Sequence, residues 1–182
     1  MSKSPRILVV SGSVIEQPVE AIVNAANTKM RGGGGLDGAI HRSAGRGLLQ
    51  ELERAAPDGS VTGEAVWTGA HNLPFKGIIH VAGPFWNEHR AQECDRLLVR
   101  AYTSALEVAV AHDVRSIGLP SISTGIYRFP LERAAKLAVD AVWNFLENPA
   151  GEPIESVLFA MFGVHEYEVF EAAVSTRGAR SL

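Results

Sequence analysis

A stretch with two asparagines, four consecutive glycines and an aspartate carries most of the chain's candidate chemistry. Asn24 and Asn27 follow an apolar run, residues 32–35 are all glycine, and Asp37 comes where a helix is expected to begin. Glycines let the backbone approach a ligand closely, and the first turn of a helix has unpaired N–H groups. A strand, a glycine loop and a helix N-terminus in this order predict a phosphate-binding site.

A second loop of small residues, 120–125, follows another apolar run, 116–119. Ligands of α/β proteins bind beyond the carboxyl ends of the strands, so we expect both loops to face one ligand from two sides. Ser121, Ser123 and Thr124 are not interpreted as nucleophiles, because no G-x-S-x-G surrounds them and no base is evident.

Two other interpretations of the glycine run are weaker. Gly33, Gly35 and Gly38 satisfy G-x-G-x-x-G, but a dinucleotide site also needs an acidic residue at the end of a second strand about 20 residues on. Asp58 has that spacing and lies in a turn after a helix, with no apolar strand before it, so hydride transfer is disfavoured. A flexible linker is disfavoured as well, because the segments that flank the run are apolar.

Hydrophobic periodicity predicts alternating strands and helices. The expected strands are 7–10, 21–23, 62–68, 77–81, 116–119 and 157–162, and the expected helices are 48–56, 94–112, 130–146 and 167–174, with one more beginning after the glycine run. This alternation predicts an α/β fold whose sheet is mostly parallel and covered on both faces.

Length and composition predict one domain over residues 1–182, since 46% apolar residues can form a sizeable core. A net charge of −3 without a basic stripe argues against bulk nucleic-acid binding. The single cysteine, Cys94, excludes an internal disulfide, and no Cys/His cluster has the spacing of metal ligands. The short polar start predicts no signal peptide and no membrane span, hence a cytoplasmic protein.

Several segments, in order, resemble those of macrodomains, in particular the ADP-ribosyl hydrolases called MacroD-type. They are Asn24-Ala25-Ala26-Asn27, residues 32–35, Asp37-Gly38-Ala39-Ile40-His41-Arg42 and Ser121-Ile122-Ser123-Thr124-Gly125-Ile126-Tyr127, supported by 62–65, 72–74 and 80–84. The resemblance covers nearly the whole chain. It implies a three-layer α/β/α fold with ADP-ribose bound above a mixed, mostly parallel sheet. It also implies hydrolysis of O-acetyl-ADP-ribose and of mono-ADP-ribosyl esters on acidic side chains of proteins, by a monomer that needs no metal or other cofactor.

The resemblance assigns catalysis to Asn27, which would hold the distal ribose, and to Asp37, beside the catalytic water. From the residues alone, Asp37 could instead be only a helix N-cap. Asn24 is interpreted as structural, within a turn. His41, four residues after Asp37 on the same helical face, either supports Asp37 or is a buried histidine with no catalytic role.

Substrate contacts are carried over to the residues that match the family's loops. They are Ser13, Val14, Gly32, Gly33, Gly34, Gly35, Ser123, Thr124, Gly125, Ile126, Tyr127 and Phe162. The glycines would line the distal ribose, residues 123–126 would hold the diphosphate, Tyr127 would pack on the ribose, and Phe162 would stack on adenine.

The chain departs from the family pattern at two positions. Ser13 stands where the family has an aspartate that accepts a hydrogen bond from the adenine amino group, and Arg128 stands where a glycine is usual. The change at Ser13 keeps a second function open, a non-catalytic module that binds ADP-ribose or another nucleotide diphosphate. Arg128 either adds a cation near the phosphates or points into solvent.

Overall fold

Strands and helices alternate in the computed structural model, which describes residues 6–180. The strands are β1 (Arg6–Ser11), β2 (Ala21–Ala26), β3 (Ala65–Thr68), β4 (Gly77–Ala82), β5 (Ser116–Leu119) and β6 (Ser156–Met161). The α-helices are α1 (Gly35–Ala44), α2 (Arg46–Ala55), α3 (Ala91–Ala111), α4 (Leu131–Glu147) and α5 (Val164–Ala179). Short 3-10 helices are η1 (Val14–Glu16), η2 (Glu88–Arg90) and η3 (Pro149–Gly151).

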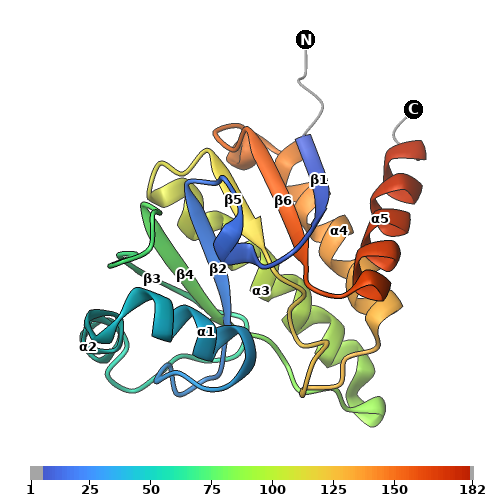
Figure 1. Cartoon of the computed structure of the whole chain (residues 1–182). Helices are drawn as coiled ribbons and strands as arrows, with labels where there is room; N and C mark the ends of the chain where they lie inside the picture. Colours follow the sequence, from blue (N-terminus) through green and yellow to red (C-terminus); the bar gives the residue numbers. More distant parts are fainter. Residues whose placement is uncertain (1–5, 181–182) are drawn as a thin grey trace.

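Within residues 6–180 the strands form a six-stranded sheet in the order β1-β6-β5-β2-β4-β3 (Figure 1). β3 at one edge is antiparallel to β4, and the other pairs are parallel. All six residues of β4 are buried, as expected for a strand that is covered on both faces. The sheet is therefore mixed and mostly parallel.

Alternating side chains of the strands pack into two apolar clusters, one on each face of the sheet. In β2, Ala21 and Val23 belong to the cluster that α3, α4 and α5 cover, whereas Ile22 belongs to the one under α1, α2 and η1. In β4, Ile79 and Ile78 divide in the same way. Helices thus cover both faces, which confirms the three-layer α/β/α fold.

The predicted boundaries differ from the observed ones by a few residues, with two informative cases. The strand expected over 62–68 begins only at Ala65, because Gly63 has φ +89° and the N–H of Glu64 closes a turn on the carbonyl of Val61. Asn24 was expected in a turn, but β2 continues through it to Ala26 and buries it completely. No helix within residues 6–180 is both long and apolar enough to span a membrane.

Candidate active site

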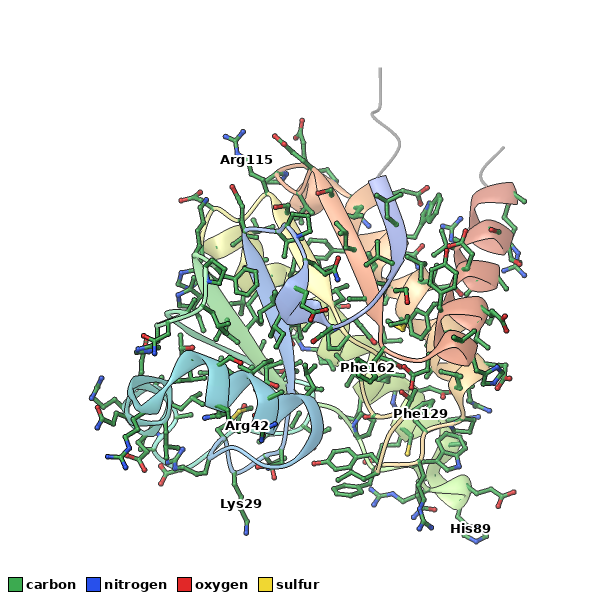
Figure 2. All side chains as sticks on the ribbon, in the orientation of Figure 1. Lys29, Arg42, His89, Arg115, Phe129 and Phe162 are labelled. Carbon is green, nitrogen blue, oxygen red and sulfur yellow. The ribbon has the colours of Figure 1, made fainter. Side chains whose placement is uncertain are left out.

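Five parallel strands end at the same edge of the sheet, and the candidate site residues follow them. Ser13 comes after β1, Phe162 after β6, residues 121–127 after β5, Asn27 after β2 and residues 83–86 after β4. In Figure 2, Phe162 lies at this lower edge of the sheet, on the side of α1 and of the loop after β5. The topology brings both predicted loops to one edge.

Asn27 shapes the glycine loop through its side-chain amide. Its Oδ1 accepts a hydrogen bond from the N–H of Lys29 (3.1 Å), and its Nδ2 donates to the carbonyl of Gly32 (3.1 Å). Such side-chain bonds to the backbone are typical of asparagine in turns. An amide nitrogen carries two protons and the bond to Gly32 uses one of them, so Asn27 can donate the second to a ligand.

The carboxylate of Asp37 and the amide of Asn27 converge beside Gly33. A Cβ built at Gly33 would lie 3.2 Å from Oδ2 of Asp37 and 3.3 Å from Nδ2 of Asn27. An acceptor and a donor therefore approach one point from two elements, the first turn of α1 and the loop after β2. A side chain at position 33 would crowd both polar atoms.

Asp37 lies inside the first turn of α1 and is only 5% exposed. The N-cap of this helix is Gly34, so the interpretation of Asp37 as a mere helix cap is wrong. Its Oδ1 accepts a 2.7 Å hydrogen bond from Nδ2 of Asn24, and Nε2 of His41 lies 3.4 Å from the same oxygen. Burial raises the pKa of the Asp37 carboxyl above its usual 3.8, although Asn24 and His41 oppose this shift.

The loop after β5 is tied to helix α3 by Tyr102, which is completely buried. The hydroxyl of Tyr102 donates to the carbonyl of Pro120 (2.9 Å) and accepts from the N–H of Ile122 (3.0 Å). Burial raises the pKa of Tyr102 well above 10, so this hydroxyl keeps its proton. These two hydrogen bonds therefore fix the start of the loop against α3.

The rest of this loop is open or strained. Ser123 has φ +68° and buries a hydroxyl that has no hydrogen-bond partner within residues 6–180, whereas Ser121 and Thr124 bond through their hydroxyls (2.6 Å). A Cβ at Gly125 would have no atom within 4 Å. Arg128 is exposed and has φ +60°, a conformation in which a glycine is less strained. Backbone strain of this kind is concentrated at functional sites.

Large apolar side chains are exposed along the same edge. Ile126 is 89% and Phe162 is 83% exposed. Tyr127 stacks on Phe85 with 3.6 Å between the ring centroids. Partial burial and the Asp37 charge both raise the pKa of Tyr127.

The Macro domain family model matches residues 23–138, from β2 through both loops and into α4. The chain belongs to the macrodomain family.

Relatives with curated names cover almost the whole macrodomain. A macro domain-containing protein of Caldanaerobacter subterraneus subsp. tengcongensis is 45% identical over 170 residues, which cover 92% of this chain and 95% of the relative. The O-acetyl-ADP-ribose deacetylase 1 of Pantoea vagans is 41% identical over 167 residues, which cover 91% of this chain and 96% of the relative.

Solved structures of other macrodomains have the same fold as this chain. The Oceanobacillus iheyensis macrodomain with ADP has a TM-score of 0.88 at 31% identity and covers 99% of this chain and 95% of that one. The Trypanosoma brucei macrodomain in complex with ADP-ribose has a TM-score of 0.84 at 38% identity and covers 93% of this chain and 69% of that one. The family and the fold predicted from the motifs are thereby confirmed, while the extent of the domain over residues 1–182 stays a prediction.

The two residues expected beside a base differ in what they can offer. The side chain of Ser13 is partly exposed and makes no capping bond to η1, so its hydroxyl can face a ligand. Val14 is 2% exposed and packs in the core, where it would collide with any side chain at Gly118. If Val14 contacts a ligand, it does so through its backbone.

Two polar residues beneath Asp37, Thr68 and His80, were not predicted from the sequence as site residues. His80 and Thr68 are completely buried on β4 and β3, and His80 lies directly beside Asn24 in the register of β2 and β4. Nδ1 of His80 is 3.1 Å from Nδ2 of Asn24, and Nε2 of His80 is 2.9 Å from Oγ1 of Thr68. One signal could have revealed them, a histidine inside an otherwise apolar strand.

Proposed function

We propose that this macrodomain binds ADP-ribose and hydrolyses O-acetyl-ADP-ribose and mono-ADP-ribosyl esters on acidic side chains of proteins. The convergence of the Asp37 carboxylate and the Asn27 amide beside Gly33 carries this proposal. A donor can hold a ribose hydroxyl there while an acceptor orients a water molecule.

The order of residues along the edge of the sheet suits an extended ligand with a base, a diphosphate and a second ribose. Ser13 and Phe162 follow the neighbouring strands β1 and β6, where an exposed aromatic ring can stack on a base. Residues 121–127 follow β5, next in the sheet, and Asn27 follows β2 beyond it. The Trypanosoma brucei relative in complex with ADP-ribose supports this choice of ligand.

The diphosphate is proposed to lie over the open side of Gly125, held by backbone N–H groups rather than by side-chain cations. Two observations support this. The space above Gly125 is free of protein atoms within 4 Å of a built Cβ, and the net charge of the chain is −3. Aligned N–H groups at loops and helix starts bind phosphates without a side-chain charge.

In the proposed reaction, Asp37 orients a water molecule toward the ester linkage. The water oxygen bonds to the anomeric or the acyl carbon and gives a proton to the Asp37 carboxylate or to a substrate phosphate. The carbon–oxygen bond of the ester breaks, and that proton passes to the departing oxygen. The products are free ADP-ribose and a carboxylic acid. A buried carboxylate is more basic than an exposed one, which brings its pKa closer to the working pH of a general base.

The alternative, a module that binds ADP-ribose or another nucleotide diphosphate without turnover, rests on Ser13, where the family usually has an aspartate. One experiment separates the two functions. A mono-ADP-ribosylated protein and O-acetyl-ADP-ribose are each incubated with wild type and with Asp37→Ala, and free ADP-ribose is measured. Release by wild type, lost in Asp37→Ala while calorimetry still detects ADP-ribose binding, supports hydrolysis. Binding without release by wild type would establish the module.

The proposal has further consequences for the need for a metal, for the oligomeric state and for the kind of substrate. We expect release to persist in a chelator, since the proposed steps use only Asp37, Asn27 and the substrate's own phosphate. We expect the protein to be monomeric on gel filtration and to act on modified proteins rather than on nucleic acids. The single buried thiol, Cys94, suits the reducing cytoplasm, which is the proposed location.

A further inference from the structure

A chain of buried hydrogen bonds runs beneath Asp37 across three neighbouring elements of the sheet. Thr68 ends β3, His80 lies in β4, and Asn24 lies in β2. All three side chains are 0% exposed. Burying polar groups costs free energy unless each is hydrogen-bonded, and apolar side chains would fill such positions at lower cost. The presence of three of them at this place requires an explanation.

The protons of this chain can be assigned one after another from Asp37. An ionised carboxylate only accepts, so Asn24 must turn its NH₂ group toward Oδ1 of Asp37. The same NH₂ group faces Nδ1 of His80, so this nitrogen must accept and the imidazole proton must be on Nε2. Nε2 then donates to the hydroxyl of Thr68, which donates onward to the carbonyl of Gly69 (3.0 Å). The donor order is consistent from end to end.

The direction of hydrogen-bond donation, from Asn24 to His80 and from His80 to Thr68, requires a neutral His80. Burial and the nearby His41 lower the pKa of His80 to about 3. A protonated His80 would place an N–H against the NH₂ of Asn24. The ionisable groups around His80 are Asp37, bonded to the shared Asn24, and His41, whose ring centroid is 6.4 Å away. With Asp37 ionised, the donor order described above is kept.

We propose that His80 and Thr68 are positioning residues for Asp37, acting through Asn24. They fix the Asn24 amide, which holds Oδ1, and thereby turn Oδ2 of Asp37 toward Asn27 and the position beside Gly33. This inference rests on the proposed function for its kinetic test, but the orientation of the carboxylate can be tested without it.

The test compares His80→Leu, His80→Asn and Thr68→Val with wild type and with Ser104→Ala. Ser104 is the matched control, because its buried hydroxyl donates to the carbonyl of Gly63 (2.6 Å), which resembles the bond of Thr68 to Gly69. His80→Asn keeps an acceptor where Nδ1 was, whereas His80→Leu removes it. Three quantities are measured: kcat for O-acetyl-ADP-ribose, affinity for ADP-ribose by calorimetry, and the pKa of the Asp37 carboxyl by carbon-13 NMR.

We expect kcat to fall about tenfold or more in His80→Leu, because small errors in the position of a catalytic group are costly, while ADP-ribose affinity changes less than about twofold. Thr68→Val should change in the same direction, and His80→Asn should recover most of the loss. The pKa of Asp37 should rise in His80→Leu and Thr68→Val, because a loose Asn24 donates less well to the carboxylate. Ser104→Ala should lose stability and change neither kcat nor this pKa.

The proposal is overturned if His80→Leu and Thr68→Val, like Ser104→Ala, leave kcat and the pKa of Asp37 at their wild-type values. It is also overturned if kcat, ADP-ribose affinity and stability fall together in all variants. If His80→Leu does not fold, Thr68→Val and His80→Asn decide. If wild type releases no product, the proposed function fails, and the carboxyl titration alone decides whether His80 and Thr68 position Asp37.

Discussion

Replacing Gly33 by alanine would test whether Asp37 and Asn27 act on one point. The new Cβ would lie 3.2 Å from Oδ2 of Asp37 and 3.3 Å from Nδ2 of Asn27, which is tighter than most contacts of a Cβ, so both polar atoms would be crowded. Losing a positioned acid–base group lowers rates by at least about 100-fold. We therefore expect kcat/KM for ester hydrolysis to fall about 100-fold, which corresponds to roughly 3 kcal/mol of activation free energy.

The same change should leave the fold intact. The φ of Gly33 lies outside the left-handed region, so alanine fits the backbone there. Replacing glycine by alanine at a compatible position stabilises by about 0.4–1 kcal/mol, and small shifts of Asp37 and Asn27 offset part of this gain. A change of 1 kcal/mol moves the melting temperature of a chain of this size by about 2–4 °C, so we expect a shift within that range.

The assay measures release of ADP-ribose beside thermal melting, with Gly178→Ala as the matched control. A Cβ at Gly178 would make an ordinary 3.6 Å contact with Trp143, near the end of α5 that is remote from the site (Figure 1). Both variants should melt near wild type, and only Gly33→Ala should lose activity. Wild-type turnover in a folded Gly33→Ala protein would refute the convergence of Asp37 and Asn27.

Four further outcomes are expected. Asp37→Asn should abolish hydrolysis yet raise the melting temperature at neutral pH. The pKa of this carboxyl is raised in the folded protein, so its contribution to stability is full below about 3.8 and is lost as the pH rises through the folded value. The difference in melting temperature between Asp37→Asn and wild type should therefore shrink toward acid pH. His80 has its pKa lowered from 6.5 to about 3, so the free energy of unfolding should decrease as the pH falls between these values, and less so in His80→Asn. Gly125→Glu should severely weaken ADP-ribose binding in calorimetry without lowering the melting temperature, because no protein atom lies within 4 Å of its Cβ; unchanged affinity would mean that the ligand lies elsewhere. Ser13→Asp should tighten ADP-ribose about tenfold, as about 1.4 kcal/mol supplies, and leave the inosine analogue unchanged, whereas equal gains on both would mean that residue 13 does not face the base.

Much of the fold was predictable because the strands are short apolar runs, because helices such as α2 and α4 bury one apolar face, and because the loops between elements contain glycine and proline. Residues 77–81 were expected as a strand, and β4 spans Gly77–Ala82. The site loops were predictable for a related reason, since parallel strands bring the residues that follow them to one edge. The expectation that the two loops lie at one edge therefore needed no knowledge of which strands are neighbours, whereas the roles expected for Asn27 and Asp37 came from the resemblance to macrodomains.

The residues beneath the site were not predictable in this way, because their meaning depends on strand order and register. Asn24 and His80 are 56 residues apart and meet only because β2 pairs with β4 in one particular register. The stacking of Phe85 on Tyr127 likewise depends on the loops after β4 and β5 lying close together. Periodicity along the chain does not contain this information.

On the proposed function, the placement of Asp37 sets stability against activity. An exposed carboxylate would cost little to ionise but would be a weak base at neutral pH, whereas a fully buried one without partners would keep its proton and could not accept another. Asp37 lies between these two cases, because burial raises its pKa and the hydrogen bond from Asn24 limits that rise. The bond is effective only while the Asn24 amide keeps its orientation. On the proposed roles of His80 and Thr68, the two buried residues that hold this amide therefore contribute to the basicity of Asp37 as well as to its position.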